Sequence, residues 1–496
     1  MHGAVRVMPS IRAGVVVLAM AACLAVPAAR GAPPREAGAR DALQASIDAY
    51  APRMARVAHE IWEHPELGYL ENRASKLLQG ELAEAGFEVQ AGIAGMPTAF
   101  VASAGNGKGP VIALLAEMDA LPGVSQAAVP EHAPIDGQGA GHACGHNLFG
   151  AGSVAAARAI ARWLHDTGSD GEIRVYGTPA EEGGSGKVYL VRAGAFDDVD
   201  VVLHWHPGDG NSAAQARTLA NISGTFRFTG VASHAAIAPG RGRSALDGVE
   251  ALDFMANMMR EHVPQQTRIH YVITDGGAAP NVVPASAAVY YYVRHPEPGV
   301  VRDVFARLQA AAEGAARGTG TSVVFEQSGG VFSVLPNDTL GKVLDASLRA
   351  VGGVDYDAGD TRFATALRET LESPPPLAGV AEIGSYSSDG QSFASTDVGD
   401  VSWAVPTAGI ATATWVPGTA AHSWQAVAAS GHAIGAAGTE VAARALALAA
   451  TRLYEDPALV SGAREEFERR RGADFSYRPL LERAAPPLDY RVTDPD

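Results

Sequence analysis

The pattern that most constrains the fold of this chain is an alternation of short apolar segments with longer amphipathic ones between residues 41 and 217. Val111–Leu115 is a continuous apolar run typical of a buried strand, and residues 150–165 then repeat apolar side chains at helical spacing. Two further runs, 173–176 and 199–203, have the composition of strands. Strand–helix alternation predicts an open mixed or parallel α/β sheet, in which the carboxyl ends of the parallel strands gather at one edge.

The order of these patterns changes between residues 218 and 329. There the sequence predicts strand, helix, two strands, helix and strand at 224–229, 245–261, 269–274, 287–294, 301–316 and 322–326. This β-α-β-β-α-β order is that of a small ferredoxin-like domain. We therefore expect this domain to be inserted into a larger one.

The larger domain is expected to occupy residues 41–217 and 330–450. Helical patterns at 340–351 and 426–450 favour this continuation after the insertion. Residues 451–496 carry runs of charged side chains and are expected to form a solvated helix and tail.

The composition excludes several classes of protein. A chain of 496 residues is too long for one hydrophobic core, and a hydrophobic content of 47% is too high for a disordered chain. The chain contains 38 Lys and Arg residues and 54 Asp and Glu residues, which gives a net charge of −16. Because this charge repels a phosphate backbone, no nucleic-acid partner is expected. Only Cys23 and Cys144 occur, which excludes a disulfide framework.

Residues 1–31 have the pattern of a cleavable signal peptide. Two arginines precede the apolar run 13–26, which is too short to span a bilayer, and small residues precede a cut after Gly31. A lipoprotein acylated at Cys23 is the alternative, but Met20 stands where that pattern has Leu. The sequence thus predicts a periplasmic or secreted protein, with no membrane-spanning segment elsewhere in the chain.

Metal-ligating side chains occur just before the predicted helix at 150–165. Cys144 and His146 stand two apart on a glycine-containing loop and can face one point, and thiolate with imidazole suits zinc or a similar divalent ion. A single thiol in an oxidising compartment is also expected to have a task. For this pair alone, a buried cysteine beside surface histidines is the alternative.

A carboxylate pair, Glu181 and Glu182, follows the predicted strand 173–176. Adjacent side chains at a strand end point in different directions, so one carboxylate can ligate a metal while the other faces the water. The alternative is a solvated acidic turn. The glycines that precede Lys187 do not form a phosphate loop, because Glu181 takes the place of the first glycine and Val188 that of Ser or Thr.

Further histidines complete the set of candidate ligands. His204 and His206 follow the predicted strand 199–203, and His422 lies in a Gly-Thr-Ala-Ala-His turn. Open α/β sheets gather ligands at the ends of their strands, which favours a common site. The pair His59 and His64 only mimics a zincin motif, because its five-residue spacing makes the two side chains diverge on a helix.

Eight short motifs follow one another along the chain: HPELG at 64–68, MDALP at 118–122, GHACGHN at 141–147, TPAEEGG at 178–184, WHPG at 205–208, SHAA at 233–236, PNVVP at 280–284 and DVGDVSW at 397–403. In this order they resemble the M20 family of metal-dependent amidohydrolases. The TPAEEGG, WHPG and DVGDVSW motifs are similar to its aminobenzoyl-glutamate utilisation protein B branch. The resemblance covers roughly residues 45–445.

This resemblance implies a zinc-peptidase-like catalytic domain with two divalent ions per subunit, zinc or manganese, with cobalt as a further candidate. It implies the following ligands: Cys144 for both ions, His146 and His206 for one, and Glu182 and His422 for the other. His206 is chosen over His204 because it stands six residues after Asp200. Glu181 is then the general base, and Asp119 orients a histidine ligand. Glu117 departs from the Asp that many relatives carry there.

The resemblance also implies that the inserted domain is a lid and dimerisation domain that contacts a small amide substrate with a carboxylate. His234 and Asn281 are expected to stabilise the oxyanion and Arg294 to pair with the carboxylate. Ordinary roles in a turn and at the surface are the alternatives for Asn281 and Arg294. We expect a homodimer in which His234 acts on the partner's site.

Two other functions compete with hydrolysis of N-acyl or aroyl amino acids or dipeptides. A binding protein that kept this fold without catalysis has no use for Glu181, and a structural metal site needs no free carboxylate. The sequence leaves open the acyl group, the amino acid and the metal.

Overall fold

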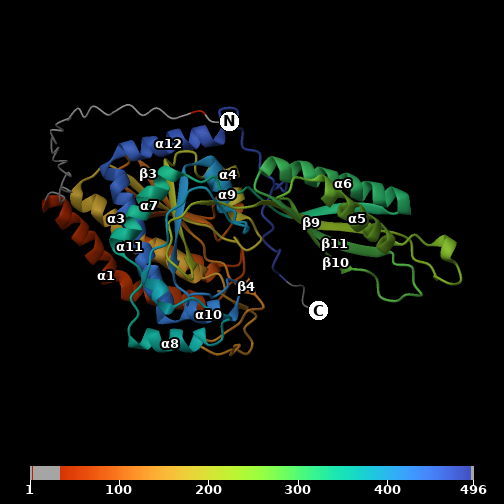
Figure 1. Cartoon of the computed structure of the whole chain (residues 1–496), viewed down its shortest axis with the longest axis horizontal. Helices are drawn as coiled ribbons and strands as arrows, with labels where there is room; N and C mark the ends of the chain where they lie inside the picture. Colours follow the sequence, from red (N-terminus) through yellow and green to blue (C-terminus); the bar gives the residue numbers. More distant parts are fainter. Residues whose placement is uncertain (1–2, 4–33, 493–496) are drawn as a thin grey trace.

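The computed structural model describes Gly3 and residues 34–492 of the chain. Apart from Gly3, the expected signal peptide lies outside the described residues. Figure 1 shows a larger α/β body and an elongated domain that projects from one side of it.

A six-stranded sheet forms the centre of the larger body. Its strands are β1 (Glu88–Ala91), β2 (Phe100–Gly105), β3 (Val111–Ala116), β6 (Glu172–Gly177), β7 (Val201–Gly208) and β14 (Thr407–Ala413). They lie in the order β1-β2-β6-β3-β7-β14, in which β6, β3, β7 and β14 are parallel and β1 and β2 are antiparallel to their neighbours. The predicted mixed or parallel α/β sheet is confirmed.

Helices cover both sides of this sheet. The helices of the larger body are α1 (Pro34–Glu63), α2 (Asn72–Glu84), α3 (His146–Thr167), α4 (Gly186–Arg192), α7 (Asp338–Val351), α8 (Ala358–Arg368), α9 (Val398–Ala404), α10 (Trp424–Gly431), α11 (Ala433–Glu455) and α12 (Pro457–Arg471). Figure 1 shows α1, α3 and α11 on one side and α4 and α9 on the other. Gly150 and Gly152 let α3 approach closely, since an added Cβ would lie within 2.8 Å of Leu78 and Trp205.

The projecting domain consists of β9 (Ala220–Thr229), α5 (Ala245–Met259), β10 (Arg268–Asp275), β11 (Ser286–His295), α6 (Pro298–Thr319) and β12 (Ser322–Val331). Its strands are antiparallel in the order β10-β11-β9-β12, and both helices lie on one face of the sheet (Figure 1). Phe226, Tyr291 and Phe305 pack in its own hydrophobic core. This is the predicted ferredoxin-like arrangement.

Two predicted elements differ from the structure. β7 begins at Val201 and continues to Gly208, so His204 and His206 lie within a strand and not after it. The single helix predicted at 426–450 is divided at His432, whose side chain accepts a hydrogen bond from Ile434 N and so starts α11. Gly431, which ends α10, packs against Trp62, and an added Cβ there would lie 2.3 Å from the indole ring.

The predictions for the last part of the chain are also corrected. The helix expected within residues 451–496 is α12, but this part of the chain is not solvated throughout, because α11 continues to Glu455, and Phe467, Leu480 and Leu481 beyond it are buried. Helix α11 is moreover long and apolar enough to cross a membrane by composition, contrary to the expectation from the sequence. However, 72% of its most apolar window is buried inside the protein, as expected for a core helix.

Candidate active site

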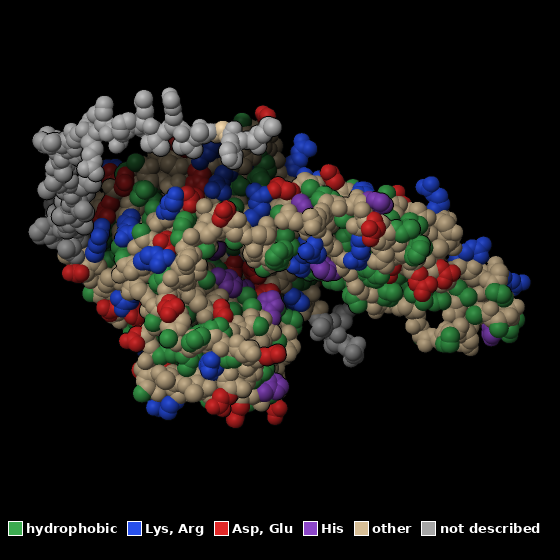
Figure 2. All heavy atoms as spheres, in the orientation of Figure 1, with side chains coloured by type: hydrophobic (Ala, Val, Ile, Leu, Met, Phe, Trp, Pro, Cys, Tyr) green, Lys and Arg blue, Asp and Glu red, His purple; other side chains and the backbone are tan. Residues whose placement is uncertain are grey.

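The candidate ligands meet at the carboxyl ends of three parallel strands. β3 is followed by Glu117 and Asp119, β6 by the segment that contains Glu181 and Glu182, and β7 ends around His206. Figure 2 shows histidine side chains on the larger body beside the place where the inserted domain joins it. The carboxyl edge of the sheet is thus the candidate site.

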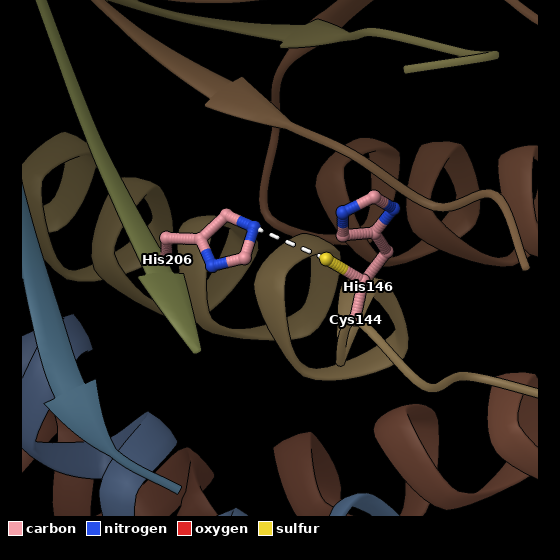
Figure 3. A group of neighbouring side chains, drawn as sticks. All are labelled: Cys144, His146 and His206. Carbon is pink, nitrogen blue, oxygen red and sulfur yellow. Dashed lines mark hydrogen bonds between the residues drawn. The ribbon is translucent and has the colours of Figure 1, made fainter. Parts of the chain in front are cut away.

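Cys144, His146 and His206 form the first group of donors (Figure 3). Cys144 Sγ lies 3.6 Å from His206 Nε2, and the rings of the two histidines are perpendicular, with centroids 5.7 Å apart. Gly145 allows this approach, since its φ is 73° and an added Cβ would lie 2.7 Å from Pro207. The loop before α3 and strand β7 therefore converge on one point.

Cys144 also belongs to a second group, with Glu182 and His422. His422 Nε2 lies 3.2 Å from Glu182 Oε1, and its backbone N donates to Ala143 O at 2.9 Å. His422 has a φ of 63°, which costs free energy in a residue other than glycine and is typical of functional sites. In each group, one donor atom per residue lies within 4.8 Å of the others.

The chemistry of these donors fits divalent cations. His146 Nε2 and Glu182 Oε1 are buried, and neither makes a hydrogen bond of good geometry among the described residues. Their nearest charged neighbours are Glu117 Oε2, 3.1 Å from His146 Nε2, and His422 Nε2, 3.2 Å from Glu182 Oε1. Burial raises the pKa of the Cys144 thiol, so a thiolate there needs a cation beside it. One thiolate, three imidazoles and one carboxylate form a mixed S, N and O set that suits zinc and similar ions.

Asp119 connects the two groups. Its Oδ1 lies 3.0 Å from His146 Nδ1, and its Oδ2 accepts a hydrogen bond from Glu182 N at 2.8 Å. Burial acts to raise the pKa of Asp119, but the hydrogen bond and the charge of His146 outweigh it and lower that pKa. An ionised Asp119 directs Nε2 of His146 toward the site, which is the expected orienting role.

Glu181 lies on the same side as the donors, in a third group with Glu117 and His146. Burial, together with the charges of Glu117 and Glu182, raises the pKa of Glu181 well above its ordinary value. Residues 180–184, which we call the acidic loop, begin at Ala180 with a φ of 58°. This strained turn lets two adjacent carboxylates face one centre.

Two groups of functional residues were missed by sequence reasoning. Glu71 is fully buried and accepts hydrogen bonds from Ala180 N and the Thr98 hydroxyl, so it holds the start of the acidic loop. Glu71 stands close after the HPELG motif, but nothing in that local pattern indicates a buried carboxylate.

The second group centres on Lys187, which sequence reasoning considered only as part of a failed phosphate loop. Its ammonium is fully buried and lies 2.7 Å from both Glu117 Oε1 and Asp397 Oδ1. Glu117 in turn lies 3.1 Å from His146 Nε2. Three motifs distant in the sequence thus form one buried charge network behind the candidate ligands.

Of the expected substrate contacts of the inserted domain, His234 and Asn281 lie together at one end of the domain, and Arg294 lies near the other. His234 and Asn281 are exposed, and their loops are joined by a bridge between His234 and Val282. The loop that carries His234 and η2 (Pro239–Arg241) lies at the end of the domain farthest from the larger body (Figure 1). We call this end the tip.

Arg294 lies near the opposite end of β11, eight residues or about 26 Å along the strand from Ser286 at the tip side. It lines a cavity of about 610 Å³ together with Arg268, His270, Tyr292, Leu219 and Phe393. None of these described lining residues is acidic, so the cavity is suited to an anion.

The remaining histidines stay outside the donor groups. His204 lies against Gly409 of β14, and burial lowers its pKa to about 4. His142 is buried beside α1, where its Nε2 lies 3.2 Å from Ile61 O. His59 pairs with Glu63 on the exposed surface of α1. Of the two histidines of β7, the structure therefore brings His206 and not His204 to Cys144.

Comparisons with known proteins agree with this arrangement. Residues 220–319 match the family described as a peptidase dimerisation domain. Over 450 residues the chain is 39% identical to a p-aminobenzoyl-glutamate hydrolase subunit from Escherichia coli, covering 85% of this chain and 93% of that protein. It is 32% identical to the Xaa-Arg dipeptidase of Mus musculus, covering 85% and 90%.

Solved structures share the fold. An aminobenzoyl-glutamate utilization protein from Klebsiella pneumoniae aligns with a TM-score of 0.55 at 20% identity, over 80% of this chain and 97% of that one. A dinuclear metal binding peptidase of the M20 family from Bacillus subtilis aligns with a TM-score of 0.51 at 19% identity, over 80% and 98%.

Proposed function

Because this chain belongs to the M20 family of peptidases and amidohydrolases, we propose that it hydrolyses the amide bond of an N-acyl or aroyl amino acid, or of a dipeptide, with a pair of divalent ions. The observation that carries this proposal is that two groups of donors share the sulfur atom of Cys144. His146 and His206 would complete the ligands of one ion, and Glu182 and His422 those of the other. Zinc or manganese is favoured, with cobalt as a further candidate.

When bound, such ions supply a water of lowered pKa and an electrophile for the carbonyl oxygen of the substrate. Glu181, which is not needed as a ligand in either group, accepts a proton from the attacking water and delivers it to the leaving amine nitrogen. Asp119 keeps His146 oriented through Nδ1 while it also holds the amide of Glu182. One carboxylate thus fixes a ligand of each ion.

The cavity beside Arg294 supports a substrate that carries a carboxylate. Arg294 Nε is buried without a hydrogen-bond partner among the described residues, and the guanidinium lies over the Tyr292 ring. Arg268 and His270 line the same cavity. A carboxylate that enters here can accept charge-assisted hydrogen bonds from an arginine whose geometry suits it.

The inserted domain supports a homodimer. The edge strand β10 and the neighbouring α5 expose four large apolar side chains, Val272, Ile273, Phe254 and Met258. Pairing β10 with its copy about a two-fold axis would cover this edge and these side chains in both subunits. An antiparallel pairing also directs the tip of each inserted domain toward the partner's larger body.

In such a dimer His234 and Asn281 would reach the partner's site, because both lie at the tip. His234 Nδ1 accepts hydrogen bonds from Ala236 N and Ile237 N, each at 3.2 Å, so the neutral ring carries its proton on Nε2. That Nε2–H can donate to the oxyanion formed by attack on the carbonyl. Secretion to the periplasm or outside the cell, through the signal peptide, is part of the proposal.

Incubation of the purified protein with p-aminobenzoyl-glutamate, N-acetyl amino acids and Xaa-Arg dipeptides tests the hydrolysis. We expect release of the free amine from at least one class after addition of zinc, manganese or cobalt, and its loss with a chelator. Binding without any turnover would instead indicate an inactive binding protein.

Mixed dimers test the action of His234 across the interface. Chains that carry His234→Ala and Glu181→Gln are refolded together, and mixed dimers are isolated with two different tags. Action in trans restores one good site in each mixed dimer, since one chain supplies the ligands and base and the other supplies the histidine. Mixed dimers without recovered activity would rule out this assignment.

A further inference from the structure

Residues 475–491 form a continuous connection between the inserted domain and the candidate site. After α12, the side chains of Phe475 and Leu480 pack against the core of the inserted domain. Gln327 of β12 donates to Leu480 O and accepts from Glu482 N, both at 2.8 Å. This end of the segment is therefore anchored where β12 leaves the inserted domain.

The segment then crosses to α4 of the larger body. Arg192 donates to Arg483 O at 2.5 Å, and the Tyr189 hydroxyl donates to Ala485 O at 3.2 Å. These bonds go to backbone carbonyls, so they fix the path of the segment whatever its side chains are.

The last contacts are made with the acidic loop. The Tyr490 hydroxyl and Arg491 Nη2 both donate to the backbone carbonyl of Glu182, at 3.2 Å and 2.6 Å. The Arg491 guanidinium also lies 4.9 Å from the centre of the Tyr490 ring, which packs edge-on against Tyr69. Two donors from outside the sheet thus converge on one peptide group of the candidate site.

That peptide group determines where the Glu182 carboxylate points. Asp119 holds Glu182 N, and the N–H of Gly183, whose φ is 97°, donates to Glu181 O at 2.7 Å within the loop itself. The donors from Tyr490 and Arg491 hold the carbonyl oxygen of the same peptide group from outside the loop. We propose that residues 475–491 are a strap, and that Tyr490 and Arg491 are positioning residues that hold Glu182 toward Cys144 and His422.

This inference rests on the proposed two-ion site and makes a selective prediction. Loss of a donor to Glu182 O should weaken the ion bound by Cys144, Glu182 and His422, while the ion bound by Cys144, His146 and His206 keeps its affinity. Outer partners of metal ligands typically change affinity about 10- to 100-fold. General loosening of the fold would weaken both ions together.

Titration of the metal-free protein with Co²⁺ alone, followed by its visible absorption, measures both affinities. We expect Arg491→Ala to lower the affinity for the ion bound by Cys144, Glu182 and His422 about tenfold or more. The affinity for the ion bound by Cys144, His146 and His206 should change less than about twofold. Arg491→Lys keeps a donor and should restore part of the loss. Arg478→Ala is the matched control, because Arg478 is an exposed arginine of the same strap whose side chain makes no hydrogen bond among the described residues.

Hydrogen exchange of the metal-free protein gives a second readout that needs no ion. Arg491→Ala and Tyr490→Phe should speed exchange at the amides of Gly183 and Gly184, whereas Arg478→Ala should not. If the unaltered protein binds two Co²⁺ ions and Arg491→Ala changes neither affinity, or both equally, the positioning role is wrong. If the unaltered protein does not bind two ions, the two-ion proposal fails, and unchanged exchange in Arg491→Ala would then overturn the strap as well.

Discussion

Replacement of Lys187 by methionine tests the buried charge network most directly. The Lys187 side chain is fully buried, and its ammonium lies 2.7 Å from carboxylate oxygens of Glu117 and Asp397, which are themselves only 1% exposed. Methionine retains a long apolar side chain of similar volume but no charge. The substitution therefore leaves two buried carboxylates without their shared cation.

The expected loss of stability follows from the cost of a buried, unpaired carboxylate. Removing one partner of a buried ion pair typically costs about 3–5 kcal/mol. An independent estimate agrees, because protonating a carboxyl group of ordinary pKa near 4 at pH 7 costs about 4 kcal/mol. Burial already raises the pKa of Asp397 to about 6, with Lys187 acting to lower it, so Asp397 is the group expected to bind a proton in the variant.

Urea unfolding followed by tryptophan fluorescence measures this loss in the right domain, because all six tryptophans lie outside residues 218–329. The matched control is Lys342→Met, which breaks an ion pair with Asp338 on a side chain that is 66% exposed. We expect about 4 kcal/mol of destabilisation for Lys187→Met at pH 7.5 and a much smaller loss for the control, whose ion pair is exposed to solvent.

The pH dependence of this loss of stability is the measurement that can refute the reasoning. A carboxyl group whose pKa is raised in the folded state keeps its proton there, so folding is favoured at low pH and this contribution is lost as the pH rises through the folded pKa. The deficit of Lys187→Met should therefore shrink by about 1.4 kcal/mol or more between pH 7.5 and pH 5.5. An equal deficit at both values, or one no larger than that of Lys342→Met, would refute the reasoning.

Three further predictions concern the site and its support. Cys144→Ser should lower metal content below two ions per chain by elemental analysis and reduce turnover, and two ions bound at full affinity would remove Cys144 from the site. Glu181→Gln should keep its metal while turnover falls about 100-fold or more, whereas Glu182→Gln should lose metal; the opposite result would exchange the two roles. Burial raises the pKa of Asp400 to about 7, so its protonated form favours folding and this contribution declines as the pH rises from about 4 to 7. Asp400→Asn should flatten this part of the stability profile in urea unfolding at pH 5 and 7.5, and an unchanged slope would exclude Asp400 as its cause.

The sequence by itself determined the features that depend on local spacing. Period-two and helical patterns predicted the six elements of the inserted domain in their correct order, because each pattern is complete within about ten residues. The spacing of Cys144 and His146 on one glycine-containing loop likewise places both side chains near one point. Such features survive in the structure because the chain around each of them decides its conformation.

The tertiary structure decided which distant residues share that point. His204 and His206 stand on the same face of β7, so residue type alone does not distinguish them. The family resemblance favoured His206 by its spacing from Asp200, and the structure places His206 beside Cys144. Lys187 lies among glycines in the sequence, but Glu117 and Asp397 from other strand and helix ends surround its ammonium. Residues 451–496, which include the strap, were expected to form a solvated helix and tail because of the charge runs at 465–466 and 469–471. The binding groups of the strap are backbone carbonyls, together with Tyr490 and Arg491, whose partner is a backbone carbonyl that sequence patterns do not reveal.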